Sequence, residues 1–249
     1  MKYIINQILD WIYPSNIKCI ICDKAISKTN TYSLCKDCFE ELNFITDSCI
    51  KCGRPILNYI IEDVSVLDTL EKCKECINKS YYFDKAIGCI EYDDLSKKIV
   101  FGLKYHKKTF MKSYIVEIMI DKLSIENINF DYILYVPLHK KRERKRGFNQ
   151  SKIIANQLGK ELGIEVLDIL ERSKNTRRLF ELDEKERKKE LKNVFKISKD
   201  IENYTNKNIL LIDDIFTTGS TVNEISKLLK LNGINEVYIF TFLTKINSY

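Results

Sequence analysis

The sequence ILLIDDIFTTGST, Ile209 to Thr221, places a run of aliphatic residues directly before two adjacent acids and a hydroxyl-rich turn. The aliphatic run has the composition of a buried strand, and the apolar residues after Thr221 recur at helical spacing. A strand that leads into a helix through such a turn is typical of an α/β domain, in which ligands bind beyond the carboxyl ends of the strands. The acids and the turn are therefore candidate ligand-binding residues.

The turn combines one glycine with four hydroxyl side chains: Thr217, Thr218, Gly219, Ser220 and Thr221. Free amides at a helix start, together with nearby hydroxyls, favour an anion such as phosphate. Asp213 and Asp214 would repel phosphate, but their carboxylates suit the two hydroxyls of a ribose, which donate hydrogen bonds. The motif predicts a site for a ribose 5-phosphate; the alternative is a strand end with two solvated acids and a capped helix.

The rest of the chain beyond residue 80 alternates between strand-like and helix-like segments. Strands are expected at 81–92, 130–138, 164–170, 209–212 and 236–243. Helices are expected at 94–106, 110–123, 150–163, 182–192 and 222–233. This alternation predicts an α/β domain with a mainly parallel sheet over residues 81–249.

Eight of the nine cysteines precede residue 77 and form four Cys-x-x-Cys pairs: Cys19/Cys22, Cys35/Cys38, Cys49/Cys52 and Cys73/Cys76. Two intervening residues allow a tight turn to direct both thiolates at one tetrahedral ion, so we predict a small zinc-binding module over residues 1–80 with one or two structural zinc ions. A disulfide framework and a redox motif are the alternatives. The simplest arrangement joins the first pair with the second and the third with the fourth; an interleaved one stays open. Cys89 stands alone in an apolar stretch and is expected in the core.

A second group of charged residues follows the expected strand at 130–138. The stretch VPLHKKRERKRGFNQ contains six basic residues: Lys140, Lys141, Arg142, Arg144, Lys145 and Arg146. Basic side chains at the carboxyl end of a strand are placed to contact pyrophosphate or a nucleic-acid backbone, and the alternative is a solvated basic loop. His139 beside this loop and His106 are the only histidines, and both are expected to be surface or structural residues.

Composition is that of an ordinary globular protein: 45% hydrophobic and 31% charged residues in a chain of 249, with a formal net charge of +6. No apolar run approaches the roughly 18 to 20 residues needed to span a bilayer. The first residues do not resemble an export signal; Ile4, Ile8, Trp11 and Ile12 share one helical face and predict a short amphipathic helix, with membrane-surface binding as an alternative.

The motif at 209–221 resembles the phosphoribosyl pyrophosphate motif of type I phosphoribosyltransferases, with Phe216 bulkier than the usual aliphatic residue. The resemblance implies that Asp213 and Asp214 contact the ribose hydroxyls and act in catalysis, and that magnesium arrives with the pyrophosphate. It also implies that residues 217–221 hold the 5-phosphate. Lys104, Arg142, Arg144 and Arg146 are the further candidates for binding this ligand.

Over most of its length the chain resembles the ComF family of competence proteins. Four cysteine pairs, Leu103-Lys104-Tyr105, the basic stretch ending Arg146-Gly147-Phe148-Asn149-Gln150, and the phosphoribosyl motif occur in the family's order. One segment departs: Arg172, Thr176, Leu182, Arg187 and Phe195 fit the family pattern, but Leu179 replaces a Gln and Glu190 an Asn. In phosphoribosyltransferases a mobile loop closes over the reacting centre near this point; an exposed charged helix is the alternative.

The resemblance implies a cytoplasmic protein of natural transformation, or one at the inner face of the membrane, that handles incoming single-stranded DNA beside a DNA-translocating ATPase. The six basic residues would follow the phosphates, and Phe148, Tyr105 or His106 would stack on bases. Two alternatives stay open. One is an active phosphoribosyltransferase with an unknown acceptor, in which the acids, magnesium and the basic stretch stabilise the transition state. The other is a sensor of a nucleotide metabolite.

Overall fold

The computed structural model describes residues 17–56, 72–105, 110–177, 182, 184–197 and 201–246. The helix predicted from Ile4, Ile8, Trp11 and Ile12 lies outside these residues, as do His106 and Leu179. Within the described residues, no helix is long and apolar enough to cross a membrane.

A four-stranded parallel sheet forms the centre of the fold, in the order β1-β6-β5-β2. The strands are β1 (Lys85–Glu91), β2 (Tyr132–Tyr135), β5 (Ile209–Phe216) and β6 (Val237–Thr244). Every neighbouring pair is parallel, with Ile209 opposite both Tyr132 and Val237. The predicted parallel α/β domain is thus confirmed.

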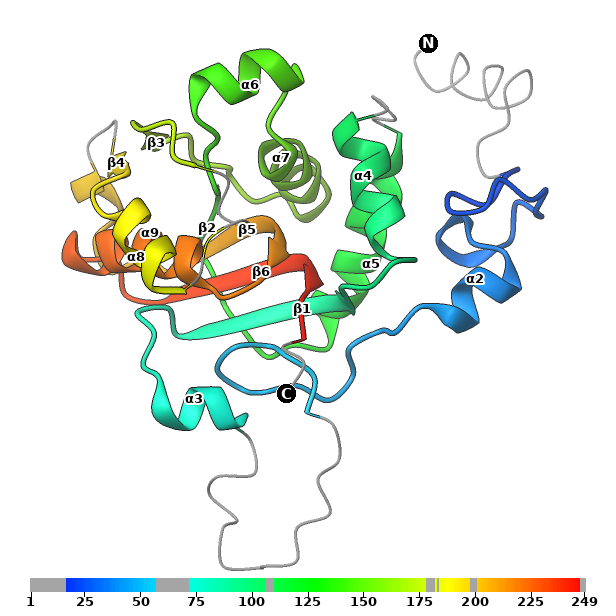
Figure 1. Ribbon diagram of the computed structural model, residues 1–249, viewed down its shortest axis with the longest axis horizontal. Helices are drawn as coiled ribbons and strands as arrows, with labels where there is room; N and C mark the ends of the chain where they lie inside the picture. The colour runs from blue at the N-terminus through cyan, green and yellow to red at the C-terminus, as the bar shows by residue number, and fades with distance from the viewer. Residues whose placement is uncertain are drawn as a thin grey trace, which may run out of the picture.

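Both faces of the sheet are buried, which explains why its central strands are nearly uniformly apolar. Alternate residues of β5 and β6 point to opposite sides: Leu210 and Phe240 join one hydrophobic core, and Leu211 and Ile239 the other. The first core is covered by α4 (Lys97–Tyr105), α5 (Met111–Ser124) and α7 (Gln150–Leu162), and the second by α9 (Ser220–Leu231) (Figure 1). Cys89 lies in the first core with 2% exposure, as predicted.

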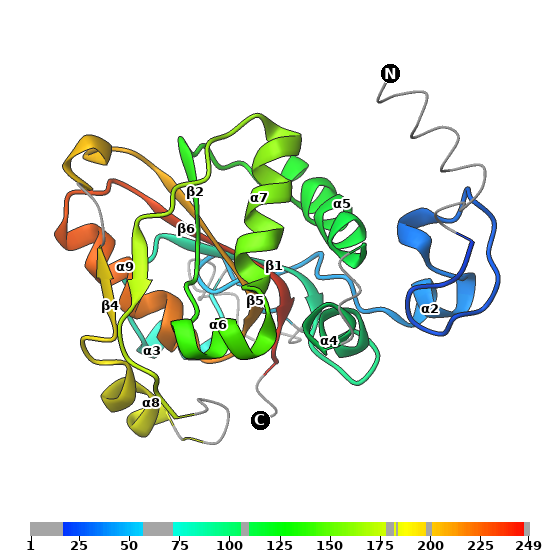
Figure 2. The ribbon, with the colours of Figure 1, turned by 90° about the horizontal axis from the view of Figure 1, so that it is seen from above.

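Smaller elements lie in the connection between β2 and β5. The helix α6 (Lys140–Arg146) follows β2, and the strands β3 (Leu170–Arg172) and β4 (Phe195–Ile197) pair antiparallel. Between these two strands lies α8 (Glu184–Leu191), and the 3-10 helix η4 (Ile201–Tyr204) precedes β5. In the view from above, α6 lies between α8 and α4 (Figure 2).

The cysteine-rich segment consists of two halves with the same backbone pattern. In each half a Cys-x-x-Cys turn is closed by a hydrogen bond of 2.8 Å, from Cys19 N to Lys24 O and from Cys49 N to Arg54 O. Each later cysteine pair opens a short helix, α2 (Lys36–Glu41) or α3 (Lys74–Asn78); the 3-10 helix η1 (Thr31–Ser33) lies in the first half. The halves lie at different sides of the sheet domain (Figure 1).

Four predicted elements are wrong in extent or type. The strand expected at 164–170 is mostly irregular: Val166 makes one isolated bridge to Ile133, and strand pairing begins at Leu170. The strand β2 is shorter than 130–138, and β5 is longer, because it continues through both acids to Phe216. The basic stretch is not a loop but the helix α6. Six basic residues can share this helix because all of its residues are at least partly exposed, so that water hydrates their charges.

Candidate functional site: two cysteine clusters and a polar cradle

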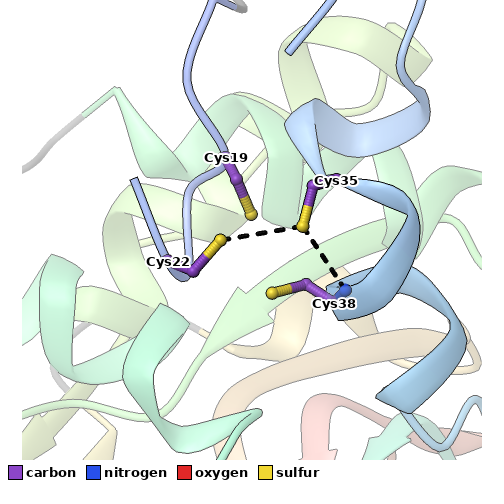
Figure 3. A group of neighbouring side chains, drawn as sticks. All are labelled: Cys19, Cys22, Cys35 and Cys38. Atoms are coloured by element: carbon purple, nitrogen blue, oxygen red, sulfur yellow. Dashed lines mark hydrogen bonds between the residues drawn. The ribbon is translucent and has the colours of Figure 1, made fainter. Parts of the chain in front are cut away.

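Two groups of four cysteines bring their sulfur atoms together, each within 4.8 Å: Cys19, Cys22, Cys35 and Cys38 form the first cluster, and Cys49, Cys52, Cys73 and Cys76 the second. All four side chains of the first converge on one point (Figure 3). The Sγ atoms of Cys22 and Cys35 are 3.6 Å apart, and those of Cys52 and Cys73 are 3.5 Å apart. A tetrahedral ion with Zn–S bonds of about 2.3 Å needs sulfur separations of about 3.8 Å, so both clusters fit zinc.

The grouping answers the question of pairing left open by the spacing. The first cysteine pair shares a cluster with the second, and the third with the fourth, whereas an interleaved arrangement is not observed. No disulfide joins any of the nine cysteines in this structure, and their two groups of four favour metal binding over a disulfide framework. Four converging thiolates fill the coordination sphere of zinc and leave no position for substrate, so these are structural rather than catalytic sites.

The acid pair lies near the end of β5, beyond the last residue that pairs with β2. The last residue of β2 pairs with Ile212, so from Asp213 onward β5 has only β6 as a neighbour. The Asp213 Oδ1 atom accepts hydrogen bonds from Ser151 Oγ at 3.0 Å and from the Asp214 backbone N–H at 2.9 Å. Both acids are half-buried, so their carboxylates are held by the fold and still reach solvent.

The turn after β5 forms a polar cradle at the start of α9. Gly219 adopts φ 74°, a left-handed conformation that disfavours other residues, and Ser220 begins the helix. The hydroxyl oxygens of Thr218 and Ser220 lie 2.8 Å apart, within reach of one shared ligand atom. A Cβ atom on Gly219 would lie 2.8 Å from Cζ of Phe216, so the bulky Phe216 lies directly beneath the turn.

The helix α6 divides the predicted basic residues into two sets. Lys141, Arg144 and Lys145 are exposed, and Lys140 is exposed beside Glu171, with an ion pair of 3.0 Å. The two others are half-buried. Arg142 donates hydrogen bonds to the backbone carbonyls of Thr176 and Arg177, and Arg146 donates to Gln150 Oε1 at 2.7 Å. Of the six, the structure gives Arg142 and Arg146 roles in holding α6 to its neighbours.

The residues at either end of α6 have structural explanations. His139 caps the start of the helix by accepting from the Lys141 N–H at 3.2 Å, as expected for a structural histidine. Gly147 ends it with φ 90°. Asn149 caps α7 and donates to the Val136 carbonyl at 3.0 Å, while Phe148 is half-buried against the first core. Lys104 belongs to the last turn of α4.

A chain of contacts joins α6 to the cradle through α8. Beyond the Arg142 contact, the Arg177 N–H donates to Glu190 Oε1 at 2.9 Å, and the Arg187 Nη1 atom donates to Thr218 Oγ1 at 3.4 Å. Glu190, where the family pattern has Asn, is thus the acceptor that ties the segment after β3 to α8. Arg187 reaches the cradle although the motif did not assign it to the site.

The buried Arg172 guanidinium interacts electrostatically with Asp213. Burial, and then the positive charge of Arg142, lowers the pKa of Arg172 to about 10, while Asp213 opposes the shift; the group stays charged at neutral pH. Arg172 Nη2 donates to Thr176 Oγ1 at 2.5 Å. Among the described residues, Arg172 Nε and Gln150 Nε2 are buried donors without a hydrogen-bond partner. Cationic and amide donors beside a carboxylate fit a ligand that carries both anionic groups and hydroxyls.

Comparison with known proteins gives two family matches: the double zinc ribbon domain matches residues 8–77 and the phosphoribosyl transferase domain matches residues 144–249. Competence protein F of Haemophilus influenzae is 27% identical over 233 residues, which cover 90% of this chain and 96% of that protein. The DNA utilization protein YhgH of Salmonella typhimurium is 24% identical, with 89% and 94% covered. Competence protein ComFC of Streptococcus pneumoniae is 26% identical, with 91% and 100% covered. The chain therefore combines a double zinc ribbon domain with a phosphoribosyl transferase domain that follows it, and its homologues include proteins named competence protein F, ComFC and YhgH.

Proposed function

We propose that this protein acts in DNA uptake during natural transformation, on the cytoplasmic side, by binding incoming single-stranded DNA. The relatives named competence proteins and DNA utilization protein support the process. The observation that carries the molecular part is the exposed basic face of α6, formed by Lys140, Lys141, Arg144 and Lys145. Four cations along one short helix match the charge of a nucleic-acid backbone, which dominates the affinity of such complexes.

The same end of the domain is proposed to bind phosphoribosyl pyrophosphate with Mg²⁺. In this assignment Asp213 and Asp214 accept hydrogen bonds from the ribose hydroxyls, and residues 217–221 take the 5-phosphate at the start of α9. Arg172 and Gln150 supply buried donors for the remaining anionic groups, and Mg²⁺ would neutralise the pyrophosphate when it is bound. Arg187, beside Thr218, is added as a phosphate ligand.

A second candidate function is phosphoribosyl transfer to an acceptor. In that reaction a nucleophile forms a bond to the anomeric carbon while the bond to pyrophosphate breaks, and pyrophosphate leaves with its electron pair. The proximity of Arg172, Arg142 and Asp213 favours it, because guanidinium groups stabilise a departing pyrophosphate and a carboxylate stabilises positive charge on the ribose.

The test of the proposed function is binding of a fluorescent single-stranded oligonucleotide, followed by anisotropy at several salt concentrations. Binding that weakens linearly with the logarithm of salt concentration is expected, because cations released from the DNA drive association. A duplex of the same length and phosphoribosyl pyrophosphate serve as competitors. The absence of binding at low salt would contradict DNA handling and leave the transferase as the better assignment.

A further inference from the structure

The two halves of the cysteine-rich segment carry an equivalent ion pair. Lys24 and Arg54 occupy the second position after Cys22 and Cys52, and Asp37 and Glu75 the position before Cys38 and Cys76. Lys24 Nζ lies 2.6 Å from Asp37, and Arg54 Nη1 lies 2.5 Å from Glu75. Each pair therefore ties the first turn of its cluster to the helix that carries the last two cysteines.

The two pairs differ in environment. The side chains of Lys24 and Asp37 are 64% and 70% exposed, whereas those of Arg54 and Glu75 are 5% and 26% exposed. Burial of a guanidinium is costly unless its N–H donors form hydrogen bonds. Arg54 meets this condition outside its own half, because Nε donates to the Lys245 carbonyl at 3.2 Å and Nη2 donates to the Thr217 carbonyl.

The contact with Thr217 fixes the first peptide of the cradle. Among the described residues every peptide bond is trans, so the Thr217 carbonyl and the Thr218 N–H point in opposite directions. A carbonyl held by Arg54 thereby orients the Thr218 amide away from the cysteine cluster. The Arg54 guanidinium also lies 5.4 Å from the centre of the Phe216 ring, and this ring packs beneath Gly219. Arg54 thus supports the turn in two ways: it holds the Thr217 carbonyl, and it packs against the Phe216 ring that lies beneath Gly219.

We propose that Arg54 is a positioning residue for the phosphate-binding turn, and that the second four-cysteine metal centre sets the ligand affinity of the domain through it. The inference rests on the proposed ribose-phosphate site. The backbone of Arg54 is part of the Cys49–Cys52 turn, and its partner Glu75 lies between Cys73 and Cys76. Metal at this cluster holds both residues in place, so loss of the metal releases the turn. Among the residues that the structure describes, the equivalent ion pair of the first cluster makes no such connection, since Lys24 and Asp37 pair at an exposed surface.

The test compares Arg54→Lys with Lys24→Ala in the full chain. Arg54→Lys keeps the charge and the Glu75 partner but cannot reach several carbonyls at once. With both metal equivalents present, it is expected to bind Mg²⁺ and phosphoribosyl pyrophosphate about tenfold more weakly by calorimetry, a factor that corresponds to about 1.4 kcal/mol. Lys24→Ala is expected to bind as the wild type does. Unchanged affinity in Arg54→Lys would overturn the inference.

Hydrogen exchange of peptides spanning residues 216–221 gives a readout that needs no ligand. Faster exchange there in Arg54→Lys, but not in Lys24→Ala, is expected for the unliganded protein. If the wild type binds no phosphoribosyl pyrophosphate, the proposed ligand fails, and this exchange still decides whether Arg54 holds the turn. If Arg54→Lys does not fold, Glu75→Gln is the second variant: it removes the charged anchor and should show the same two effects more weakly. Wild-type exchange in Glu75→Gln would contradict the inference.

Discussion

The Ser151 hydroxyl donates a hydrogen bond of 3.0 Å to Asp213 Oδ1, although 62 residues separate them. Ser151 lies in the first turn of α7, which Asn149 caps from the end of the basic stretch. The contact connects the two motifs that were recognised separately in the sequence. It also holds Asp213 Oδ1 in place, together with the Asp214 backbone N–H.

Removal of this hydroxyl is expected to weaken ligand binding without unfolding the chain. Ser151→Ala deletes one hydrogen bond to a charged group, which contributes about 1.5 to 3 kcal/mol where it is buried and less where the carboxylate reaches water. Affinity for Mg²⁺ and phosphoribosyl pyrophosphate should fall about 3- to 10-fold by calorimetry. Ser124→Ala, at the exposed end of α5, is the control. Equal affinities in all three proteins would contradict a role for Ser151.

Gly219 should not tolerate a side chain. Gly219→Ala combines a positive φ of 74° with a Cβ atom only 2.8 Å from Phe216, and it should abolish detectable ligand binding. Gly163→Ala is the matched control, because its φ is 70° but nothing lies within 4 Å of the added atom. The control should lose about 1 kcal/mol of stability and keep its affinity. Loss of affinity in both variants would contradict this account, because it would show that the effect does not depend on the contact with Phe216.

Two charges on the outer face of α6 should control DNA binding. The double variant Lys141→Ala/Lys145→Ala removes two exposed cations and leaves Arg142 and Arg146, which hold the helix in place. The slope of log affinity against log salt for single-stranded DNA should become shallower by about 1.4. A double variant of two exposed lysines on α7 and α9, Lys160→Ala/Lys227→Ala, should keep the wild-type slope. Identical slopes in the two double variants would remove α6 from the DNA-binding surface.

Metal analysis should find two zinc equivalents, and each cluster should account for one. Cys22→Ser and Cys52→Ser are each expected to retain about one equivalent. Cys52 is 1% exposed in a cluster that joins the second core, and the neighbouring Lys51 carbonyl accepts from the Ala86 N–H of β1 at 2.9 Å. Cys52→Ser should therefore lower Tm by roughly 10 °C, the equivalent of about 3 kcal/mol, and Cys22→Ser by less. Full metal content in both variants would exclude zinc coordination by these thiolates.

Stability should fall in acid partly through Glu126. Burial raises the pKa of this carboxyl, but hydrogen bonds from Lys85 at 2.6 Å and from Lys122, with which it forms an ion pair of 3.0 Å, outweigh burial and lower it. A lowered pKa in the folded chain adds stability above the unfolded value, and this contribution is lost as pH falls through the folded value. Glu126→Gln should be about 1 to 2 kcal/mol less stable at pH 7, and the gap should close below about pH 4.5. A constant gap down to pH 3 would contradict this account.

The parallel sheet and both cysteine clusters follow from local sequence patterns, because burial on both faces and ligand spacing leave signatures within short segments. Contacts between distant residues leave none. Arg187 to Thr218, Arg54 to Thr217 and Ser151 to Asp213 join residues 31, 163 and 62 positions apart. In the sequence, Arg54 is distinguished only by its position, which is equivalent to that of Lys24. Its role becomes visible when its buried surroundings are compared with the exposed surroundings of Lys24.

The errors in the predicted elements also have physical causes. Charge density suggested a loop at 140–146, but lysine, arginine and glutamate are good helix formers, and His139 and Gly147 supply both caps. The segment 164–170 has the residues of a strand, yet Asp168 accepts from Tyr135 Oη at 2.5 Å and from Lys152 at 2.9 Å. These side-chain contacts hold it at the sheet edge with a single bridge in place of a ladder.

The central claim, a working ribose-phosphate site in this domain, is tested most directly by thermal unfolding with Mg²⁺ and phosphoribosyl pyrophosphate in the wild type and in Asp214→Asn. Ligand at about a hundredfold above its dissociation constant should stabilise the wild type by about 2.7 kcal/mol. The variant, which keeps its shape but offers the ribose a neutral amide, should show little or none of this. A wild-type protein that is not stabilised at all would contradict the claim, and the exposed face of α6 would remain as the site to pursue.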